Sequence, residues 1–136
     1  GPEEKRIQKM IRSLHLEGNV HMLGFRDDIV DVMKSLDLFL ITSKTEGLGT
    51  IVLEAFAAGV PVVATRAGGI PEMVEDTVTG LLAEPGDTES LKNATLCVLT
   101  DPLLKNTFVE NALTRVQDFS YQATAEKTLE IYKRSE

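Results

Sequence analysis

The sequence has little of the chemistry that builds disulfide-linked domains or metal centres. Its single cysteine, Cys97, excludes an internal disulfide and a cysteine-based metal cluster. Cys97 lies within the apolar run 94–99, which predicts a buried and unreactive thiol. The two histidines, His15 and His21, stand in unrelated contexts and are expected to be structural or surface residues. We therefore predict neither a metal site nor another cofactor.

Long apolar runs and positive charge are also scarce. No apolar run approaches the roughly 18 residues that a membrane span needs, and no signal-peptide core is present. The formal net charge is -7, with 14 Lys and Arg against 21 Asp and Glu. A broad nucleic-acid surface would need clustered cations to replace phosphate counterions. These absences predict a cytoplasmic protein that binds no nucleic acid.

The chain does contain a regular alternation of short apolar runs and longer amphipathic segments. Its 136 residues suit one domain, residues 1–136. Strands are expected at 20–25, 38–42, 61–65 and 81–83. Helices are expected at 3–17, 26–35, 50–58, 71–75, 87–99, 102–116 and 121–134. The alternation predicts an α/β fold, a Rossmann-like parallel sheet of about four strands with helices on both faces.

A glycine-containing loop follows the second predicted strand, where parallel sheets bind ligands beyond the carboxyl ends of their strands. Glu46 opens this loop, and Gly47 and Gly49 would let the backbone turn tightly and approach a ligand. Thr50 is a candidate N-cap, and the helix start after it would offer free N–H groups to an anion. Taken alone, such a loop is more often an ordinary connection between a strand and a helix.

Glu54 adds a second acidic group near this loop. It interrupts the otherwise apolar segment 51–58, where a carboxylate must find partners or become protonated. It lies one turn, about 6 Å, from the start of the helix, so Glu46 and Glu54 are expected to overlook one cleft. A carboxylate has two acceptor oxygens, which suit a vicinal diol of a ribose or hexose. The alternative is an exposed glutamate that only adds helix propensity.

The loop after the third predicted strand, residues 66–72, is expected to open on the same edge of the sheet. Pro71 suits the first turn of a helix. Arg66 reads most simply as surface charge, and Glu72 equally well as a complement to the helix dipole.

Glu46, seven residues and Glu54 resemble the paired-glutamate motif of the retaining glycosyl transferases group 1, which have the GT-B fold. The segments 43–65, 68–74 and 79–82 resemble the core signature of that family, so the resemblance covers nearly the whole chain. It implies the C-terminal, nucleotide-sugar-binding part of an enzyme that transfers a hexosyl or N-acetylhexosaminyl group with retained configuration, as in polysaccharide biosynthesis.

The resemblance also implies roles for individual residues. Glu54 would hold the ribose hydroxyls, and Glu46 would be the catalytic residue, lying against the transferred sugar. Gly24 and Phe25 would lie near the nucleobase. The sugar and diphosphate would meet the backbone of Gly47, Leu48, Gly49 and Thr50. Catalysis would come from positioning and from stabilising the leaving group, usually without a metal.

The chain also departs from the family pattern. The N-terminal acceptor-binding domain is missing, and so are two opening βα segments, one of which carries an Arg/Lys pair that grips the diphosphate. We therefore expect the isolated fragment to be inactive and to bind nucleotide weakly or not at all. In the family's strand order the missing segments lie between 20–25 and 38–42, which predicts an altered sheet or self-association. Many relatives act on lipid-linked acceptors at the inner membrane face, and the missing domain would carry that contact.

Three other functions fit parts of the sequence. The first is a non-catalytic nucleotide-sugar-binding or interaction module of the same fold, against which the intact Glu46 and Glu54 argue mildly. The second is a GT-B enzyme of different chemistry, such as a nucleotide-sugar epimerase, which would lack this glycine-and-glutamate string. The third is a generic flavodoxin-like module, which gives no reason for a charge at position 54.

Overall fold

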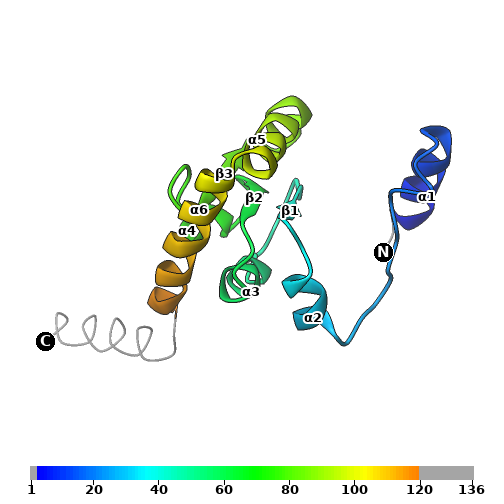
Figure 1. Ribbon diagram of the computed structural model, residues 1–136. Coiled ribbons are helices and arrows are strands. Elements are labelled where there is room, and N and C mark those ends of the chain that lie inside the picture. The colour runs from blue at the N-terminus through cyan, green and yellow to red at the C-terminus, as the bar shows by residue number, and fades with distance from the viewer. Residues whose placement is uncertain (1–2, 120–136) are drawn as a thin grey trace, which may run out of the picture.

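The computed structural model describes residues 3–119, in which helices surround a three-stranded sheet (Figure 1). The strands are β1 (Phe39–Ile41), β2 (Val62–Thr65) and β3 (Gly80–Ala83). The helices are α1 (Glu4–Ser13), α2 (Ile29–Lys34), α3 (Ile51–Ala57), α4 (Ile70–Met73), α5 (Thr88–Thr100) and α6 (Pro102–Arg115), followed by a 3-10 helix (Val116–Phe119). The helix predicted at 121–134 lies outside the described residues.

The sheet is parallel throughout, in the order β1-β2-β3. Phe39 pairs with Val62, and Val62 pairs with Gly80. Because parallel strands share a direction, their carboxyl ends form one rim, and each connection between them returns through a helix. The predicted α/β fold with a parallel sheet is confirmed, with three strands in place of about four.

The core lies on both faces of β2. Val62 and Ala64 belong to a buried cluster with Phe56 of α3, whereas Val63 belongs to a second cluster with Phe108 of α6. All four residues of β2 are buried, as expected for a central parallel strand covered by helices on both sides. This double cover fixes the position of the sheet rim from which the predicted site loops leave.

Two aspartates cap the starts of α5 and α6, the two longest of the described helices. The Asp87 carboxylate accepts a hydrogen bond from the Ser90 backbone N–H at 3.0 Å, at the start of α5. Asp101 accepts two such bonds at the start of α6, where Pro102 fills the first turn. Side-chain capping of this kind satisfies amide groups that have no partner within the helix. None of the described helices is both long and apolar enough to span a membrane.

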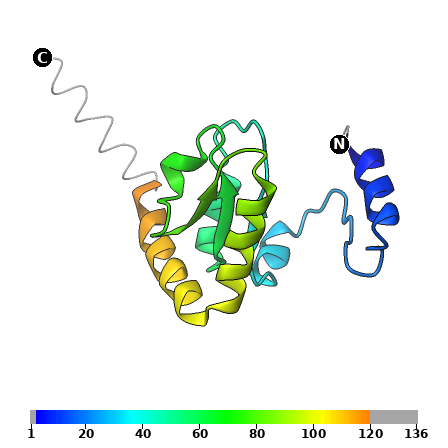
Figure 2. The same cartoon turned by 90° about the horizontal axis from the view of Figure 1, so that it is seen from above.

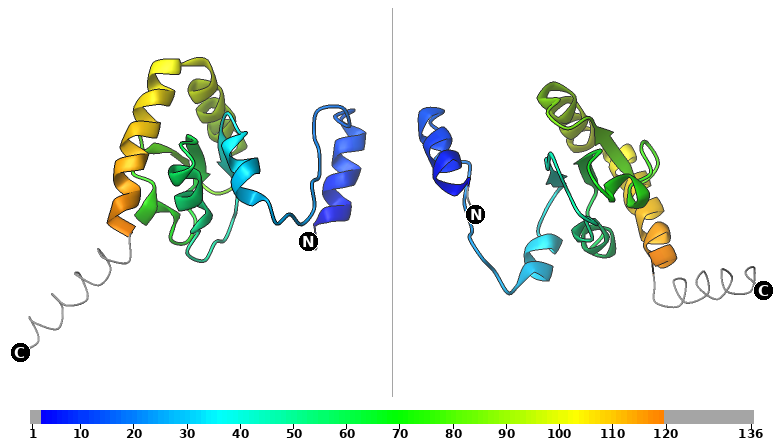
Figure 3. Two further views of the ribbon diagram at one scale, coloured as in Figure 1. Left: turned by 60° about the horizontal axis from the view of Figure 1, so that its bottom comes forward. Right: turned by 180° about the vertical axis from the view of Figure 1, so that it is seen from behind.

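The segment 20–25 is the main departure from the predicted fold. It forms no strand, and its side chains are exposed, from 42% for Val20 to 97% for Phe25. Helix α1 buries no residue either, and it stands apart from the sheet in every view (Figures 2 and 3). A strand needs a neighbour for its backbone hydrogen bonds, and no strand lies beside residues 20–25 within the described part of the chain. The strand predicted at 20–25 is therefore wrong.

Two buried positions were also predicted wrongly. Cys97 is exposed on α5, because that helix turns Leu91 and Val98 toward the sheet instead. Leu40 of β1 is 42% exposed, although the strand was expected to be covered on both faces. β1 is an edge strand, and the described residues do not fully cover it.

Candidate functional site

Glu46 lies on the loop that leaves β1 at the sheet rim. Its Oε2 accepts a hydrogen bond from the Ser43 hydroxyl at 3.0 Å, and its Oε1 accepts one from the Gly47 backbone N–H at 3.2 Å. The side chain is half-buried. Both donors belong to the same loop, so the carboxylate position follows the loop backbone. The carboxylate retains free acceptor capacity, because each oxygen can accept more than one bond.

The other residues of the predicted loop lie between Glu46 and α3. Gly49 has a φ of +67°, which favours glycine, and it is buried, whereas Leu48 is 76% exposed. Thr50 occupies the N-cap position of α3 as predicted, but its side chain makes no capping hydrogen bond. Gly47 and Leu48 are exposed at this rim, although the Gly47 N–H already donates to Glu46 and its carbonyl oxygen accepts from Gly69.

Glu54 lies one turn into α3 and is exposed. It borders a cavity of about 200 Å³ between α2 and α3, together with Val30, Met33, Lys34, Ala57 and Ala58. Glu46 does not line this cavity. A single cleft shared by Glu46 and Glu54 therefore stays a prediction.

Gly24 and Phe25 lie in a different part of the molecule. They border a hollow of about 540 Å³ whose remaining walls come from Met22 and from residues 3–8 at the start of α1. Glu46 and Glu54 do not line this hollow. The predicted nucleobase contact would require the segment 20–25 to approach α3, and it remains a prediction.

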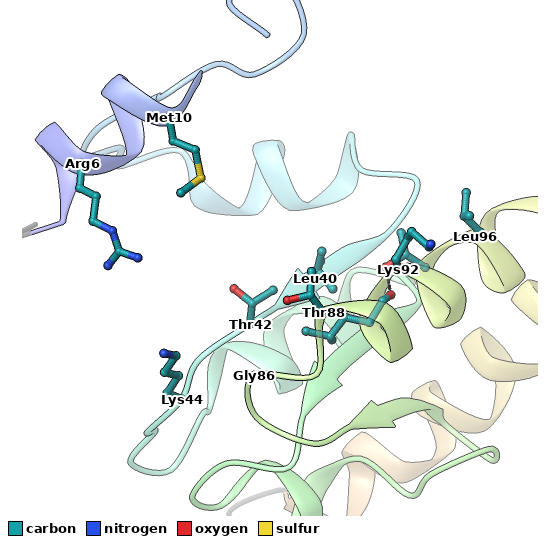
Figure 4. Close-up of a pocket in the computed structure, with 11 residues that line it drawn as sticks. Arg6, Met10, Leu40, Thr42, Lys44, Gly86, Thr88, Lys92 and Leu96 are labelled. Carbon is teal, nitrogen blue, oxygen red and sulfur yellow. Dashed lines mark hydrogen bonds between the residues drawn. The ribbon is translucent and has the colours of Figure 1, made fainter. Parts of the chain in front are cut away.

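A larger cavity, of about 650 Å³, lies along the open edge of β1 and contains none of the predicted site residues. Figure 4 shows Leu40 of β1 between α1, which contributes Arg6 and Met10, and α5, which contributes Lys92. Lys44, from the same loop as Glu46, lies at one end. Cavity size alone would therefore place the site away from the glutamates.

The loop after β2 packs directly against the loop of Glu46. The Thr65 hydroxyl donates to the Ser43 backbone carbonyl at 2.6 Å. The Gly69 backbone N–H donates to the Gly47 backbone carbonyl at 2.8 Å. The sequence indicated that both loops open on one edge, but not that they touch. The signal that could have found this contact is the adjacent pair Gly68-Gly69, since paired glycines after a strand often mark close backbone approach.

Arg66, at the start of the same loop, is engaged elsewhere. Its Nη2 lies 2.5 Å from the Asp76 carboxylate, and its Nε lies 3.4 Å from that of Glu84. The Asp76 carboxylate also accepts a hydrogen bond from the Leu82 backbone N–H at 2.8 Å. Arg66 thus faces carboxylates beside β3. Across residues 3–119, no three His, Cys, Asp or Glu side chains gather as a metal site would require.

Comparisons with known proteins identify the relatives of this chain. Residues 1–115 match the family described as Glycosyl transferases group 1. The chain is 36% identical over 133 residues to an N-acetyl-alpha-D-glucosaminyl L-malate synthase from Bacillus anthracis, which covers 98% of this chain and 34% of that protein. It is 37% identical over 108 residues to a D-inositol 3-phosphate glycosyltransferase from Saccharomonospora viridis, covering 79% of this chain and 25% of that protein.

Solved structures give the same picture. The Anabaena protein HepE in complex with UDP has a TM-score of 0.87 at 34% identity, over 98% of this chain and 38% of that chain. Its complex with UDP-glucose has a TM-score of 0.84 at 35% identity, over 96% and 36% of the two chains. The chain thus spans between 25% and 38% of the length of these relatives.

Proposed function

Because the chain belongs to the glycosyl transferases group 1 family, we propose that it supplies the donor-binding part of a retaining glycosyltransferase. The donor is a nucleotide-sugar, and the transferred group is a hexosyl or N-acetylhexosaminyl unit. The observation that carries the proposal is the similarity, over 98% of the chain, to a protein solved with UDP and with UDP-glucose. The acceptor-binding part would lie in a longer polypeptide.

The proposed roles follow the rim of the sheet. Glu54 accepts hydrogen bonds from the ribose hydroxyls, and Glu46 accepts them from the transferred sugar. The backbone from Gly47 to Thr50 meets the sugar and diphosphate. The half-buried, hydrogen-bonded position of Glu46 supports its role, because a carboxylate held by its own loop needs little reorganisation when the sugar binds. Gly24 and Phe25 would meet the nucleobase after the segment 20–25 moves toward α3.

In the proposed reaction, the bond from the anomeric carbon to the diphosphate breaks, and a bond to an acceptor oxygen forms on the same face. The nucleoside diphosphate leaves with the bonding electron pair, and the acceptor hydroxyl passes its proton to an oxygen of the departing diphosphate. The chain's own contribution is positioning and stabilisation of the leaving group. Arg66 is already paired with carboxylates, so the proposal gives it no part in diphosphate binding. Backbone amides, and cations outside residues 3–119, would balance the diphosphate charge.

The test is a titration of the 136-residue chain with UDP, followed by the shifts of its backbone amide signals in NMR spectra. We expect weak binding with shifts confined to residues 24–25 and 46–54, and no sugar transfer by the chain alone. Glu54→Gln should abolish the shifts, whereas Glu110→Gln, an exposed change on α6, should leave them unchanged.

Two outcomes would contradict different parts of the proposal. Robust transfer by the isolated chain would overturn the need for a further acceptor part. If a longer protein that contains the chain also failed to bind UDP, the donor-binding role itself would be wrong. Binding without transfer in that longer protein would favour a non-catalytic nucleotide-sugar-binding module.

A further inference from the structure

The loops after β1 and β2 meet most closely at Gly68. Its φ is +51°, and a Cβ built on it would lie 2.5 Å from the Gly47 carbonyl oxygen and closer still to that of Glu46. The Glu46 carbonyl carbon would be 2.6 Å away. All three atoms belong to the backbone, so no side-chain rotation can relieve the overlap. A side chain at position 68 can fit only if the peptide between Glu46 and Gly47 and the loop of Gly68 move apart.

The neighbouring contacts tie the same loop down on either side. The Thr65–Ser43 and Gly69–Gly47 hydrogen bonds hold its first half. On the other side, a Cβ on Gly49 would meet the Ile70 side chain at 2.8 Å, and Ile70 is fully buried. These contacts all come from residues 65–70 and lie on both sides of the Glu46–Gly47 peptide along the chain, so a shift at Gly68 is carried into the loop of Glu46.

The Glu46 carboxylate must follow such a shift. Both of its hydrogen-bond donors, the Ser43 hydroxyl and the Gly47 N–H, lie on the displaced segment. Glu54 is different, because it lies on α3. The three atoms nearest to a Cβ built on Gly68 belong to Glu46 and Gly47, and none of them belongs to that helix. A change at Gly68 should therefore move Glu46 and leave Glu54 in place.

We infer that Gly68 is a positioning residue for Glu46 in the transfer step. The inference rests on the proposed function, in which Glu46 contacts the transferred sugar and Glu54 the ribose. A displaced Glu46 weakens the contact with the reacting sugar, and misplacement by about 1 Å costs on the order of a hundredfold in rate. Nucleotide binding through Glu54 is little affected. Because binding through Glu54 persists while Glu46 is displaced, a change at Gly68 should lower kcat by a larger factor than it raises the donor KM.

The experiment compares Gly68→Ala with Gly86→Ala. Gly86 also has a positive φ, +91°, but a Cβ there would meet nothing within 4 Å. Gly86→Ala therefore places an alanine at a positive φ without displacing any neighbouring atom. In the ligand-free chain, the amide signals of residues 46–49 should shift in Gly68→Ala and stay fixed in Gly86→Ala. In a transferase that contains the chain, Gly68→Ala should lower kcat about a hundredfold and raise the donor KM by a smaller factor, and Gly86→Ala should change neither.

Gly69→Ala provides a milder variant in case Gly68→Ala does not fold. The backbone φ of Gly69 is -79°, which suits alanine, and its Cβ would meet the Leu48 carbonyl oxygen at 2.9 Å. We expect smaller shifts of the same signals and an intermediate fall in kcat. Unshifted amides in both variants, or a kcat equal to that of Gly86→Ala, would overturn the inference. If the unsubstituted longer protein failed to bind UDP, the proposed function would be wrong instead. The two failures can be told apart because the amide shifts are measured without ligand.

Discussion

Helices α3 and α1 both carry apolar residues at helical spacing, but only one of them is buried. In α3, Val52, Ala55 and Phe56 are completely enclosed against the sheet. In α1, Ile7 and Met10 remain 44% and 50% exposed. Helix α3 is apolar at every position except Glu54, whereas α1 has one apolar stripe among charged residues, but even that stripe finds no apolar surface beside it. An amphipathic pattern gives a helix the capacity to pack, and a neighbouring apolar surface is needed to realise it.

The same contrast separates β2 from the segment 20–25. Both were predicted as strands from short apolar runs. β2 lies between β1 and β3 and is buried on both faces, whereas residues 20–25 have no adjacent strand and stay irregular. The body of the chain, residues 33–115, is therefore held by its own core, and the N-terminal region, residues 4–28, contributes no buried residue to it.

The largest expected effect is a core truncation in the body. Phe56→Ala should lower the free energy of unfolding by about 3–5 kcal/mol, because it removes a fully buried ring and leaves a cavity. Ile7→Ala in α1 should change it by less than about 0.5 kcal/mol. Urea unfolding followed by circular dichroism measures both, and Val52→Ala serves as a milder core variant. A comparable loss for Ile7→Ala would show that α1 belongs to the core.

A medium effect is expected on self-association, because α1 presents an exposed apolar surface. We expect the chain to associate at high concentration, and the double variant Ile7→Lys and Met10→Lys to raise the required concentration on the order of tenfold. The control is Leu103→Lys on α6, which is 80% exposed and lies in the body. Sedimentation velocity across a concentration series measures the association. A monomer at every concentration would contradict the expectation.

The smallest expected effect is on the pH dependence of stability. It concerns two exposed aspartates, Asp87 in the body and Asp28 in the N-terminal region. Hydrogen bonds from the Ser90 amide and hydroxyl hold the pKa of Asp87 below its ordinary 3.8, and the Arg26 guanidinium does the same for the pKa of Asp28. A lowered folded-state pKa adds stability above the unfolded value, and this contribution is lost as the pH falls through the folded pKa. It should therefore be constant near neutrality and begin to decline as the pH falls below about 4.

Only Asp87 should affect the unfolding of the body, because it caps α5, whereas Asp28 pairs with Arg26 at the end of the N-terminal region. Asp87→Asn should slightly reduce the acid dependence of the urea midpoint, and Asp28→Asn should leave it unchanged. Midpoints at pH 7 and pH 3 provide the measurement. An equal response to both substitutions would mean that the two regions unfold together.

Much of the fold was predictable from local features. The runs at 61–65 and 81–83 and the helix at 102–116 match β2, β3 and α6 closely, because glycine, proline and capping aspartates mark their ends. The glutamate loop was placed at the correct rim by the rule that ligand loops follow parallel strands. Cys97 was placed wrongly, because an apolar run does not reveal which side of a helix meets the sheet.

The sequence by itself determined the parallel α/β fold, the family and the identity of the candidate site residues, because these depend on patterns of neighbouring residues. Only the tertiary structure decided that residues 20–25 stay outside the sheet and that the backbone at Gly68 presses against Glu46. Both outcomes depend on contacts between segments distant along the chain. A strand requires a partner to complete its hydrogen bonds, and a steric contact requires two loops to arrive at the same place.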